Sequence, residues 1–270
     1  MLATAFRRLI PQAHFVDKAS LDVCEEKGVR NLFSQGGYRL LVNCAAYTKV
    51  DLAEQEPDRA DNVNGYAVEN LAQACRENDA MLVHFSTDYV FDGTLRRPLR
   101  PDDPVGPQSA YGRSKLLGEK LLQQYALNHW LIIRTAWLYG PGGPCFPQAI
   151  LNAARAGKPL NVVDDQIGSP TLTFDLAQAT LELIDKNAQG IWHVVNDGQT
   201  SWHDFAAAIL DEFKVDARLS RTTSAEWKKT RPNSATRPAY SVLDISPFEK
   251  LTGHRTRHCG DALREYARVA

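Results

Sequence analysis

Short apolar segments alternate with amphipathic segments along most of the chain. The apolar segments are runs of Leu, Val and Ile, which is typical of strands buried on both faces of a parallel sheet. The amphipathic segments repeat Leu and Ala at every third or fourth position, as helices with one buried face do. After a helix at the N-terminus, we expect strands over 13–17, 39–47, 81–88, 130–140 and 190–197, and helices over 67–78, 111–126, 174–187 and 201–213. Strands that alternate with helices predict an α/β fold with a doubly wound parallel sheet.

The sequence changes character after Gly140. A loop, PGGPCFP, is followed by one helix and one short strand, and the last part of the chain is rich in Arg, Thr, Ser and Pro. Ser201 precedes an amphipathic segment and is the expected N-cap of that helix. These changes predict a sheet domain and a smaller C-terminal lobe. The sheet domain comprises 1–145 and about 172–190. The C-terminal lobe comprises 146–171 and 191–270.

Composition and charge argue against several classes of protein. The 270 residues are 44% hydrophobic and 23% charged, with a net charge of -1 and no long run of like charges. This balance gives no electrostatic basis for binding nucleic acid or a membrane surface, and no apolar run reaches the roughly 18 residues of a membrane span. The five cysteines are scattered without a CxxC pair, which argues against a disulfide framework and a zinc site. We expect a cytoplasmic protein and assign no metal, because His193 and His203 are isolated histidines.

Polar side chains gather where the predicted strands end. Open parallel sheets bind ligands at the carboxyl ends of their strands, which selects 43–48, 86–89 and 134–140. Tyr111 and Lys115 form a further candidate pair, because residues four apart share one face of a helix. A lysine ammonium beside a tyrosine lowers the pKa of the phenol and makes it a usable proton donor and acceptor. YxxxK is common by chance, but here it follows a Ser-Thr strand end by about 24 residues, which is a known catalytic layout.

Several longer motifs carry a resemblance to a known family. They are NCAAYTKVDLAEQEPDRADNVN, STDYVFDG, YGRSKLLGE, RTAWLYG, DDQIGSPT, TSWHDFA and RPAYSVLD, spread in this order over 39–244. The sequence resembles the extended short-chain dehydrogenase/reductase superfamily and, within it, the dTDP-4-dehydrorhamnose reductase family. The resemblance implies a Rossmann-like sheet with a smaller substrate-binding lobe. It also implies reduction of the C4 ketone of dTDP-4-dehydro-L-rhamnose by NADPH or NADH, and a possible homodimer.

The resemblance implies roles for particular residues. Tyr111 would protonate the ketone oxygen, Lys115 would bind the nicotinamide ribose and tune Tyr111, and Thr87 would polarise the ketone. The implied substrate-binding residues are Thr87, Asp88, Tyr89, Trp137 and Arg237. The implied cofactor-binding residues are Asp17, Lys18, Asp22, Val23, Ala45, Ala46, Tyr47, Tyr111 and Lys115. Asp17 favours an unphosphorylated ribose, whereas Lys18 could accept the 2'-phosphate of NADPH.

The sequence departs from the family at its start. Family members open with a strand and a glycine-rich turn that holds the cofactor pyrophosphate, whereas here Met1 follows the position of the second glycine and Ala3 takes that of the third. We therefore expect the first strand to be missing, through a misplaced start or a fragment. If the cell makes the chain as given, we expect impaired folding and weak cofactor binding. A smaller departure is Cys145, where the family usually has Asn before Phe.

Two other functions stay open from the sequence. The first is a non-catalytic regulatory subunit of the same fold, which the missing glycine turn favours and the Thr-Tyr-Lys set opposes. The second is a related sugar-nucleotide epimerase or dehydratase. Dehydratases usually carry an acid beside the threonine, as Asp88 is here, so the distinction depends on the motifs AAYTKVD and DDQIGSPT.

Overall fold

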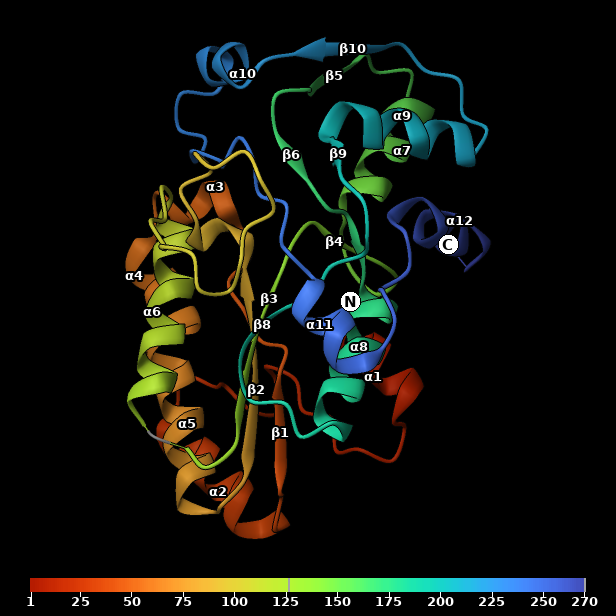
Figure 1. Ribbon diagram of the computed structural model, residues 1–270. Helices are drawn as coiled ribbons and strands as arrows, with labels where there is room; N and C mark the ends of the chain where they lie inside the picture. Colours follow the sequence, from red (N-terminus) through yellow and green to blue (C-terminus); the bar gives the residue numbers. More distant parts are fainter. Residues whose placement is uncertain (126, 270) are drawn as a thin grey trace.

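A four-stranded parallel sheet forms the centre of the molecule in a computed structural model, which describes residues 1–125 and 127–269. Its strand order is β1-β2-β3-β8, and Figure 1 shows it between two layers of helices. The strands are β1 (Leu40–Asn43), β2 (Met81–Thr87), β3 (Trp130–Thr135) and β8 (Gly190–His193). The register places Asn43 beside His84 and Thr87 beside Thr135, so the carboxyl ends of the strands lie along one edge.

Helices cover both faces of the sheet, on the left and right in Figure 1. One layer contains α2 (Glu26–Gly36), α5 (Ala67–Glu77) and α6 (Ala110–Gln124), and the other contains α1 (Leu2–Leu9), α8 (Thr173–Asp185) and α11 (Ser246–Thr252). Successive strand residues point to opposite faces. Leu82 and Ile132 therefore pack against the first layer, and Val83 and Phe85 against the second. The predicted α/β, Rossmann-like fold is confirmed.

Short elements connect the sheet to its helices. The connection from β1 to α5 contains α3 (Val50–Ala53), α4 (Pro57–Asp61) and the π-helix η1 (Asn62–Tyr66). The 3-10 helix η2 (Asp88–Val90) begins directly after β2. Because α6 packs against both η1 and η2, the segments that follow β1 and β2 share one supporting helix.

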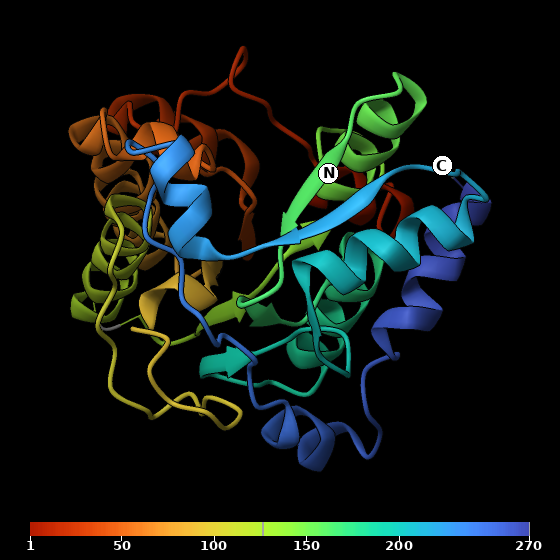
Figure 2. The same cartoon turned by 90° about the horizontal axis from the view of Figure 1, so that it is seen from above.

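A second apolar core lies outside the sheet, around Tyr139, Ile150 and Phe205. The helices that build it are α7 (Phe146–Arg155), α9 (Trp202–Glu212) and α12 (Cys259–Val269), and the same part of the chain forms α10 (Ser224–Thr230), which buries none of its residues. The paired strands that contribute to this core are β5 (Leu160–Val163) with β10 (Leu219–Thr222), and β4 (Leu138–Tyr139) with β7 (Thr171–Leu172). A third pair, β6 (Ile167–Gly168) with β9 (Thr200–Ser201), lies outside it. Figure 2 shows β5 and β10 side by side. The Ser201 hydroxyl accepts a hydrogen bond from the amide of Asp204, so the predicted N-cap is confirmed.

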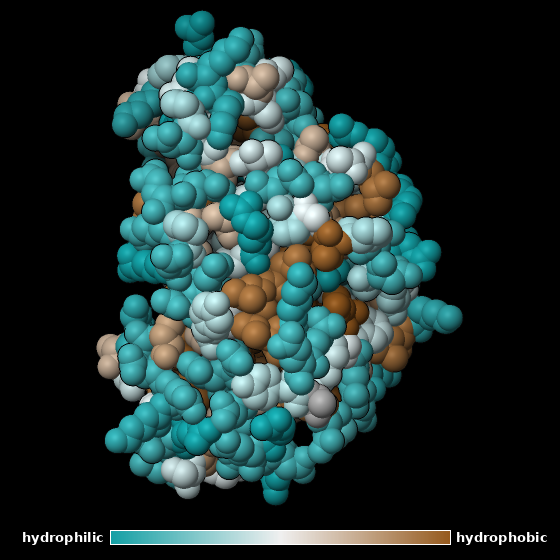
Figure 3. All heavy atoms as spheres, turned by 90° about the vertical axis from the view of Figure 1, so that its left-hand side faces the viewer, coloured by the Kyte–Doolittle hydropathy of each residue, from teal (hydrophilic) through white to brown (hydrophobic). Residues whose placement is uncertain are grey.

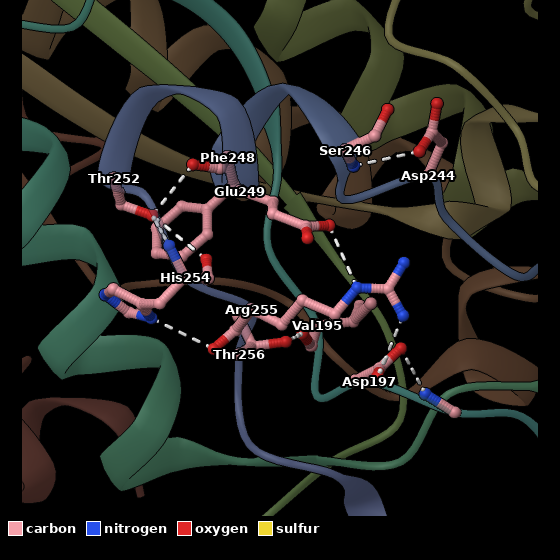
Figure 4. A network of polar contacts seen from close by, with 11 residues as sticks. Val195, Asp197, Asp244, Ser246, Phe248, Glu249, Thr252, His254, Arg255 and Thr256 are labelled. Atoms are coloured by element: carbon pink, nitrogen blue, oxygen red, sulfur yellow. Dashed lines mark hydrogen bonds and ion pairs between the residues drawn. The ribbon is translucent and has the colours of Figure 1, made fainter.

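Two elements that the sequence assigns to the C-terminal lobe pack with the sheet. β8 pairs with β3, and Phe248 of α11 joins the core of the sheet. A polar network connects α11 to the segment after β8 (Figure 4). In it, Arg255 pairs with Glu249 at 2.9 Å and with Asp197 at 3.4 Å. The division into 1–145 with 172–190, and 146–171 with 191–270, stays a prediction, and these contacts favour moving β8 and α11 to the sheet domain.

Three expected strands differ from those observed. Residues 13–17 form no strand, because they pair with no neighbour in the described chain and an unpaired strand is not stable; Val16 is 41% exposed. The strand expected over 39–47 ends at Asn43, since Asn43 turns the chain by accepting the amide of Ala45. The strand expected over 130–140 is interrupted because Trp137 has a positive φ of 49°.

Over residues 1–125 and 127–269, no helix is long and apolar enough to cross a membrane. Within the same residues, no group of three or more His, Cys, Asp and Glu side chains is placed to hold a metal ion.

Candidate active site

The end of β2 delivers three polar residues to the edge of the sheet. The Thr87 hydroxyl accepts a hydrogen bond from the amide of Tyr89 at 3.2 Å and donates to Asp88 Oδ1 at 3.0 Å. This cap starts η2 and turns the chain at the point where the strand ends. Thr87 and Asp88 are both buried.

Asp88 is a buried carboxyl with an unused acceptor. Within the described residues, its Oδ2 atom has no hydrogen-bond partner. Burial raises the pKa of Asp88 to about 6, and the nearby hydroxyl groups of Ser241 and Thr87 oppose this rise. A buried polar atom without a partner is costly. Asp88 is therefore suited to receive a hydroxyl group of a ligand.

α6 brings Tyr111 and Lys115 to the same edge. The Ser109 hydroxyl accepts the amide of Gly112 at 3.1 Å and caps the helix, which places Tyr111 in its first turn. Tyr111 lies edge-on to Tyr89, with ring centroids 5.7 Å apart. Burial raises the pKa of Tyr111 to about 12, against a hydrogen bond with Thr87 that lowers it. The expected lowering of this pKa by Lys115 is wrong for this structure, because burial dominates and the Lys115 nitrogen lies 3.3 Å from His84 Nε2.

Two glycines allow close approach between the segments of the site. A Cβ on Gly112 would lie 2.3 Å from the carbonyl oxygen of Tyr89, so only glycine lets α6 pack this closely on η2. Gly93 has a positive φ of 76°, and its Cβ would lie 2.6 Å from Pro238. This contact holds the segment that carries Arg237 against the turn after η2.

Arg237 reaches the site already paired with a carboxylate. Its guanidinium contacts Asp51 Oδ1 at 2.9 Å and donates to the carbonyl of Ala235 at 3.1 Å. The positive charge of Arg237 opposes the rise that burial causes in the pKa of Tyr89. Arg237 therefore lies on the η2 side of the cluster. Beside this ion pair is a hollow of about 240 Å³, lined by Asp51, Gln55 and 231–234.

A buried ion pair fixes α6 to β3. Arg134 donates to both carboxylate oxygens of Glu119, at 2.9 and 2.7 Å, and its guanidinium also lies 5.1 Å from the Phe91 ring centre. Glu119 is one helical turn beyond Lys115. Asn43 and Arg134 lie within the segments 43–48 and 134–140 that the sequence selects, but the sequence analysis assigns no role to either residue, nor to Glu119 or to His84, which contacts Asn43. The available signal was a charged or polar residue inside an otherwise apolar strand.

The residues implied for the cofactor fall in two places. Ala45 and Ala46 are exposed at the end of β1. The neighbouring Tyr47 is buried, and its backbone exchanges two hydrogen bonds with the Asn64 side chain, at 2.8 and 3.0 Å. Asn64 also donates to Ser114 of α6 at 2.9 Å. This loop is thus fixed beside α6, and its small exposed alanines fit a flat ring lying along the edge of the sheet.

The other implied cofactor residues lie in an exposed loop before α2. Asp17 Oδ1 accepts the amides of Ala19 and Ser20, at 3.1 and 3.0 Å, and these bonds lower the pKa of Asp17. Lys18 and Asp22 form a surface ion pair at 3.7 Å. Val23 is half-buried, and its carbonyl accepts Asn70 of α5 at 3.2 Å. In the described part of the chain, no hydrogen bond or ion pair joins this loop to Thr87, Tyr111 or Lys115.

Trp137 lies just past the end of β3 and faces the second core. Its ring stacks on Trp202 with centroids 3.5 Å apart and planes 5° from parallel. A Cβ on Gly168 would lie 2.5 Å from the Trp137 ring. This packing fixes the indole ring of Trp137. The backbone of Trp137 has a positive φ, a conformation that non-glycine residues rarely adopt, and such conformations are concentrated at functional sites.

The structure thus brings Thr87, Asp88, Tyr89, Tyr111, Lys115 and Arg237 to one edge of a Rossmann-like sheet. A threonine at a strand end, with Tyr111 and Lys115 on the adjoining helix, is the layout that the sequence resemblance implies. The chain belongs to the family described as RmlD substrate binding domain, whose sequence model matches residues 2–270.

Named relatives agree with this family. The chain is 41% identical over 249 residues to the spore coat polysaccharide biosynthesis protein SpsK of Bacillus subtilis, covering 92% of this chain and 86% of that protein. It is 40% identical over 254 residues to a dTDP-4-dehydrorhamnose reductase of Streptomyces griseus, covering 92% and 82%. Among solved structures, the Bacillus anthracis dTDP-4-dehydrorhamnose reductase in complex with NADP superposes with a TM-score of 0.93 at 30% identity, covering 100% and 95%.

Proposed function

We propose that this chain reduces the C4 ketone of dTDP-4-dehydro-L-rhamnose to give dTDP-L-rhamnose, with NADPH as the reductant. The observation that carries this proposal is the cluster at the carboxyl edge of the sheet, in which Thr87 and Lys115 are buried and Tyr111 is half-buried. Membership of the RmlD family and the names of the relatives supply the substrate and the reductant.

Tyr111 is the proton donor in this proposal. With its pKa near 12, the phenol stays protonated at neutral pH and can pass its proton to the ketone oxygen as that oxygen becomes an alkoxide. The Thr87 hydroxyl, which donates to Asp88 in the structure, can donate to the same oxygen and polarise the ketone. When bound, the reduced nicotinamide supplies the hydride.

Other residues hold the two reactants. Asp88 and Tyr89 bind the sugar, with the free Oδ2 atom of Asp88 accepting a sugar hydroxyl. Trp137 provides an apolar wall for the sugar ring, and Arg237 contacts the pyrophosphate from the side of the 240 Å³ hollow. Lys115 binds the nicotinamide ribose, and Ala45, Ala46 and Tyr47 line the path of the cofactor.

The adenosine end of the cofactor would lie on the exposed loop before α2. Here Asp17, Lys18, Asp22 and Val23 contact the ribose and adenine. Lys18 is largely exposed, so it is free to turn from Asp22 toward a 2'-phosphate. We therefore favour NADPH over NADH, and the ratio of kcat/KM for the two reductants tests this preference.

The experiment that tests the activity follows NADPH oxidation with dTDP-4-dehydro-L-rhamnose. Tyr111→Phe should lower kcat by about 100-fold or more, because general acid catalysis typically contributes that much. Tyr125→Phe, at the other end of α6, is the matched control and should keep full activity. A Tyr111→Phe variant as active as the control would contradict the role of Tyr111. Absence of turnover in the unaltered chain would contradict the reductase proposal and leave the regulatory subunit or the epimerase and dehydratase alternatives.

We also propose that two copies associate through the face formed by α4, η1 and α6. Figure 3 shows apolar side chains gathered in the middle of the face that lies on the left in Figure 1. This part of the chain carries Tyr66, which is 51% exposed, and the half-buried Leu117 and Leu121. Leu121→Glu should therefore convert a dimer to a monomer in light scattering, and an unchanged mass would contradict this surface.

We place the protein in the cytoplasm, because its five cysteines are free and free thiols are typical of a reducing compartment. The near-neutral charge gives no reason to add nucleic acid or a membrane as a partner. Fractionation of cells that express the tagged chain tests this location.

A further inference from the structure

Three buried side chains form a continuous polar chain behind the candidate active site. Asn43 at the end of β1 lies 3.2 Å from His84 Nδ1, measured from its amide nitrogen. His84 Nε2 lies 3.3 Å from the Lys115 nitrogen. All three are buried, and His84 has no exposed surface. His84 follows Leu82 on the face of β2 that packs against α6, so strand alternation directs this imidazole at the lysine.

The backbone fixes the direction of hydrogen bonding along this chain. The amide of Ala45 can only donate, and its partner at 3.0 Å is Asn43 Oδ1. The other side-chain atom of Asn43 is therefore the NH2 group, which can only donate to His84 Nδ1. A neutral imidazole that accepts at Nδ1 carries its proton on Nε2. That N–H points at Lys115.

His84 stays neutral in this setting. Burial holds the pKa of His84 well below its ordinary value, and the nearby Lys115 lowers it further. On the neighbouring elements, Asn43 of β1 contacts His84 and Asn64 of η1 contacts Ser114, the residue before Lys115, and both side-chain amides are neutral. The charged neighbour on α6 is Glu119, which is already paired with Arg134 of β3. The Nε2–H group of His84 thus faces a lysine whose nearest carboxylate is engaged elsewhere.

We propose that His84 is a positioning residue that donates its Nε2–H to the Lys115 nitrogen and thereby favours the uncharged amine over the ammonium ion. Only the effect on turnover rests on the proposed reductase function. Burial independently lowers the pKa of Lys115 to about 8. An amine that titrates in this range can take a proton from solvent and return it to Tyr111 after the substrate has taken the phenolic proton. Asn43 acts one step further back, by fixing the tautomer of His84.

Asn43→Asp reverses the hydrogen bonds with little change of shape. One carboxylate oxygen still accepts the amide of Ala45, but the other now accepts from His84. The imidazole proton should move to Nδ1, and Nε2 should become an acceptor for the Lys115 ammonium. Nitrogen-15 NMR of labelled histidine reads the tautomer, and NMR of labelled lysine follows the titration of Lys115. We expect the Nε2–H tautomer in the unaltered protein, the Nδ1–H tautomer in Asn43→Asp, and a Lys115 midpoint raised by about one unit or more.

The negative charge that Asn43→Asp adds needs its own control. Asn43→Asp combined with His84→Leu keeps the charge and removes the imidazole. Measured against His84→Leu alone, the double variant should show less than half of the shift in the Lys115 midpoint that Asn43→Asp causes in the unaltered protein. An equal shift in these two comparisons would overturn the proposal, and so would an Nδ1–H tautomer in the unaltered protein, which requires no variant to fold. The high-pH limb of kcat/KM should move with the Lys115 midpoint. If the tautomers behave as expected but no turnover is found, the proposed function fails and this inference stands.

Discussion

Breaking the buried pair between Glu119 and Arg134 should destabilise the protein strongly. Both side chains are almost fully buried, at 1% and 3% exposure, and two hydrogen bonds join them. Glu119→Gln removes the negative charge and one of the two acceptor oxygens. The guanidinium keeps the remaining amide oxygen, the carbonyl of Pro101 at 3.1 Å and the face of Phe91 as partners, but no counter-charge. An uncompensated buried charge of this kind costs about 3 to 5 kcal/mol, which corresponds to a loss in Tm on the order of 10 °C for a chain of this size.

Urea denaturation followed by circular dichroism measures this effect. The matched control is Glu26→Gln, which breaks an exposed pair with Arg30 and should cost at most about 1 kcal/mol. Replacing both buried partners, Glu119→Leu with Arg134→Met, should recover much of the loss because no unpaired charge is left. A Glu119→Gln variant within about 1 kcal/mol of the unaltered protein would refute the claim that this pair anchors α6 to β3.

Two further predictions concern Asp88 and Gly112. The folded-state pKa of Asp88 is raised to about 6 from an ordinary value of 3.8. Its ionisation therefore opposes folding fully above pH 6 and only slightly at pH 4. Asp88→Asn should be more stabilising at pH 7 than at pH 4, by roughly 2 kcal/mol. Denaturation at both pH values checks this, and an equal effect at both would contradict it. Gly112→Ala should push α6 away from Tyr89, lower kcat and cost about 1 to 3 kcal/mol, whereas Arg113→Ala, on the exposed side of α6, should change stability by less than about 0.5 kcal/mol. Equal stability and kcat for the two variants would contradict the close approach at Gly112.

The sequence predicts the parts of the fold that depend on local pattern. Apolar runs and helical spacing are properties of neighbouring residues, so β2, α6 and α8 lie where the pattern indicates them, to within two residues at each end. The run at 13–17 has the same local pattern but forms no strand, because a strand also needs a partner alongside it. Trp137 interrupts an apolar run through its backbone conformation, which no residue type in that run indicates.

The candidate site divides in the same way. The order of Thr87, Tyr111 and Lys115 along the chain predicts that they meet, since strand ends and the first turn of the next helix share one edge of a parallel sheet. His84 and Arg134 are visible as polar residues in apolar strands, but their partners lie on α6, 31 and 15 positions away. The sequence alone does not specify these contacts. Nor does it specify that the pKa of Tyr111 is raised, because this shift comes from burial, which only the fold determines.

The transfer of deuterium tests the central claim most directly. NADPH deuterated at C4 of the nicotinamide is incubated with dTDP-4-dehydro-L-rhamnose and the purified chain, and the sugar nucleotide is analysed by mass spectrometry and NMR. A reductase places one deuterium at C4 of dTDP-L-rhamnose, and Tyr111→Phe should abolish most of that signal while Tyr125→Phe keeps it. Recovery of unreduced substrate would contradict the account. Recovery of an epimerised or dehydrated sugar without net oxidation of NADPH would also contradict it.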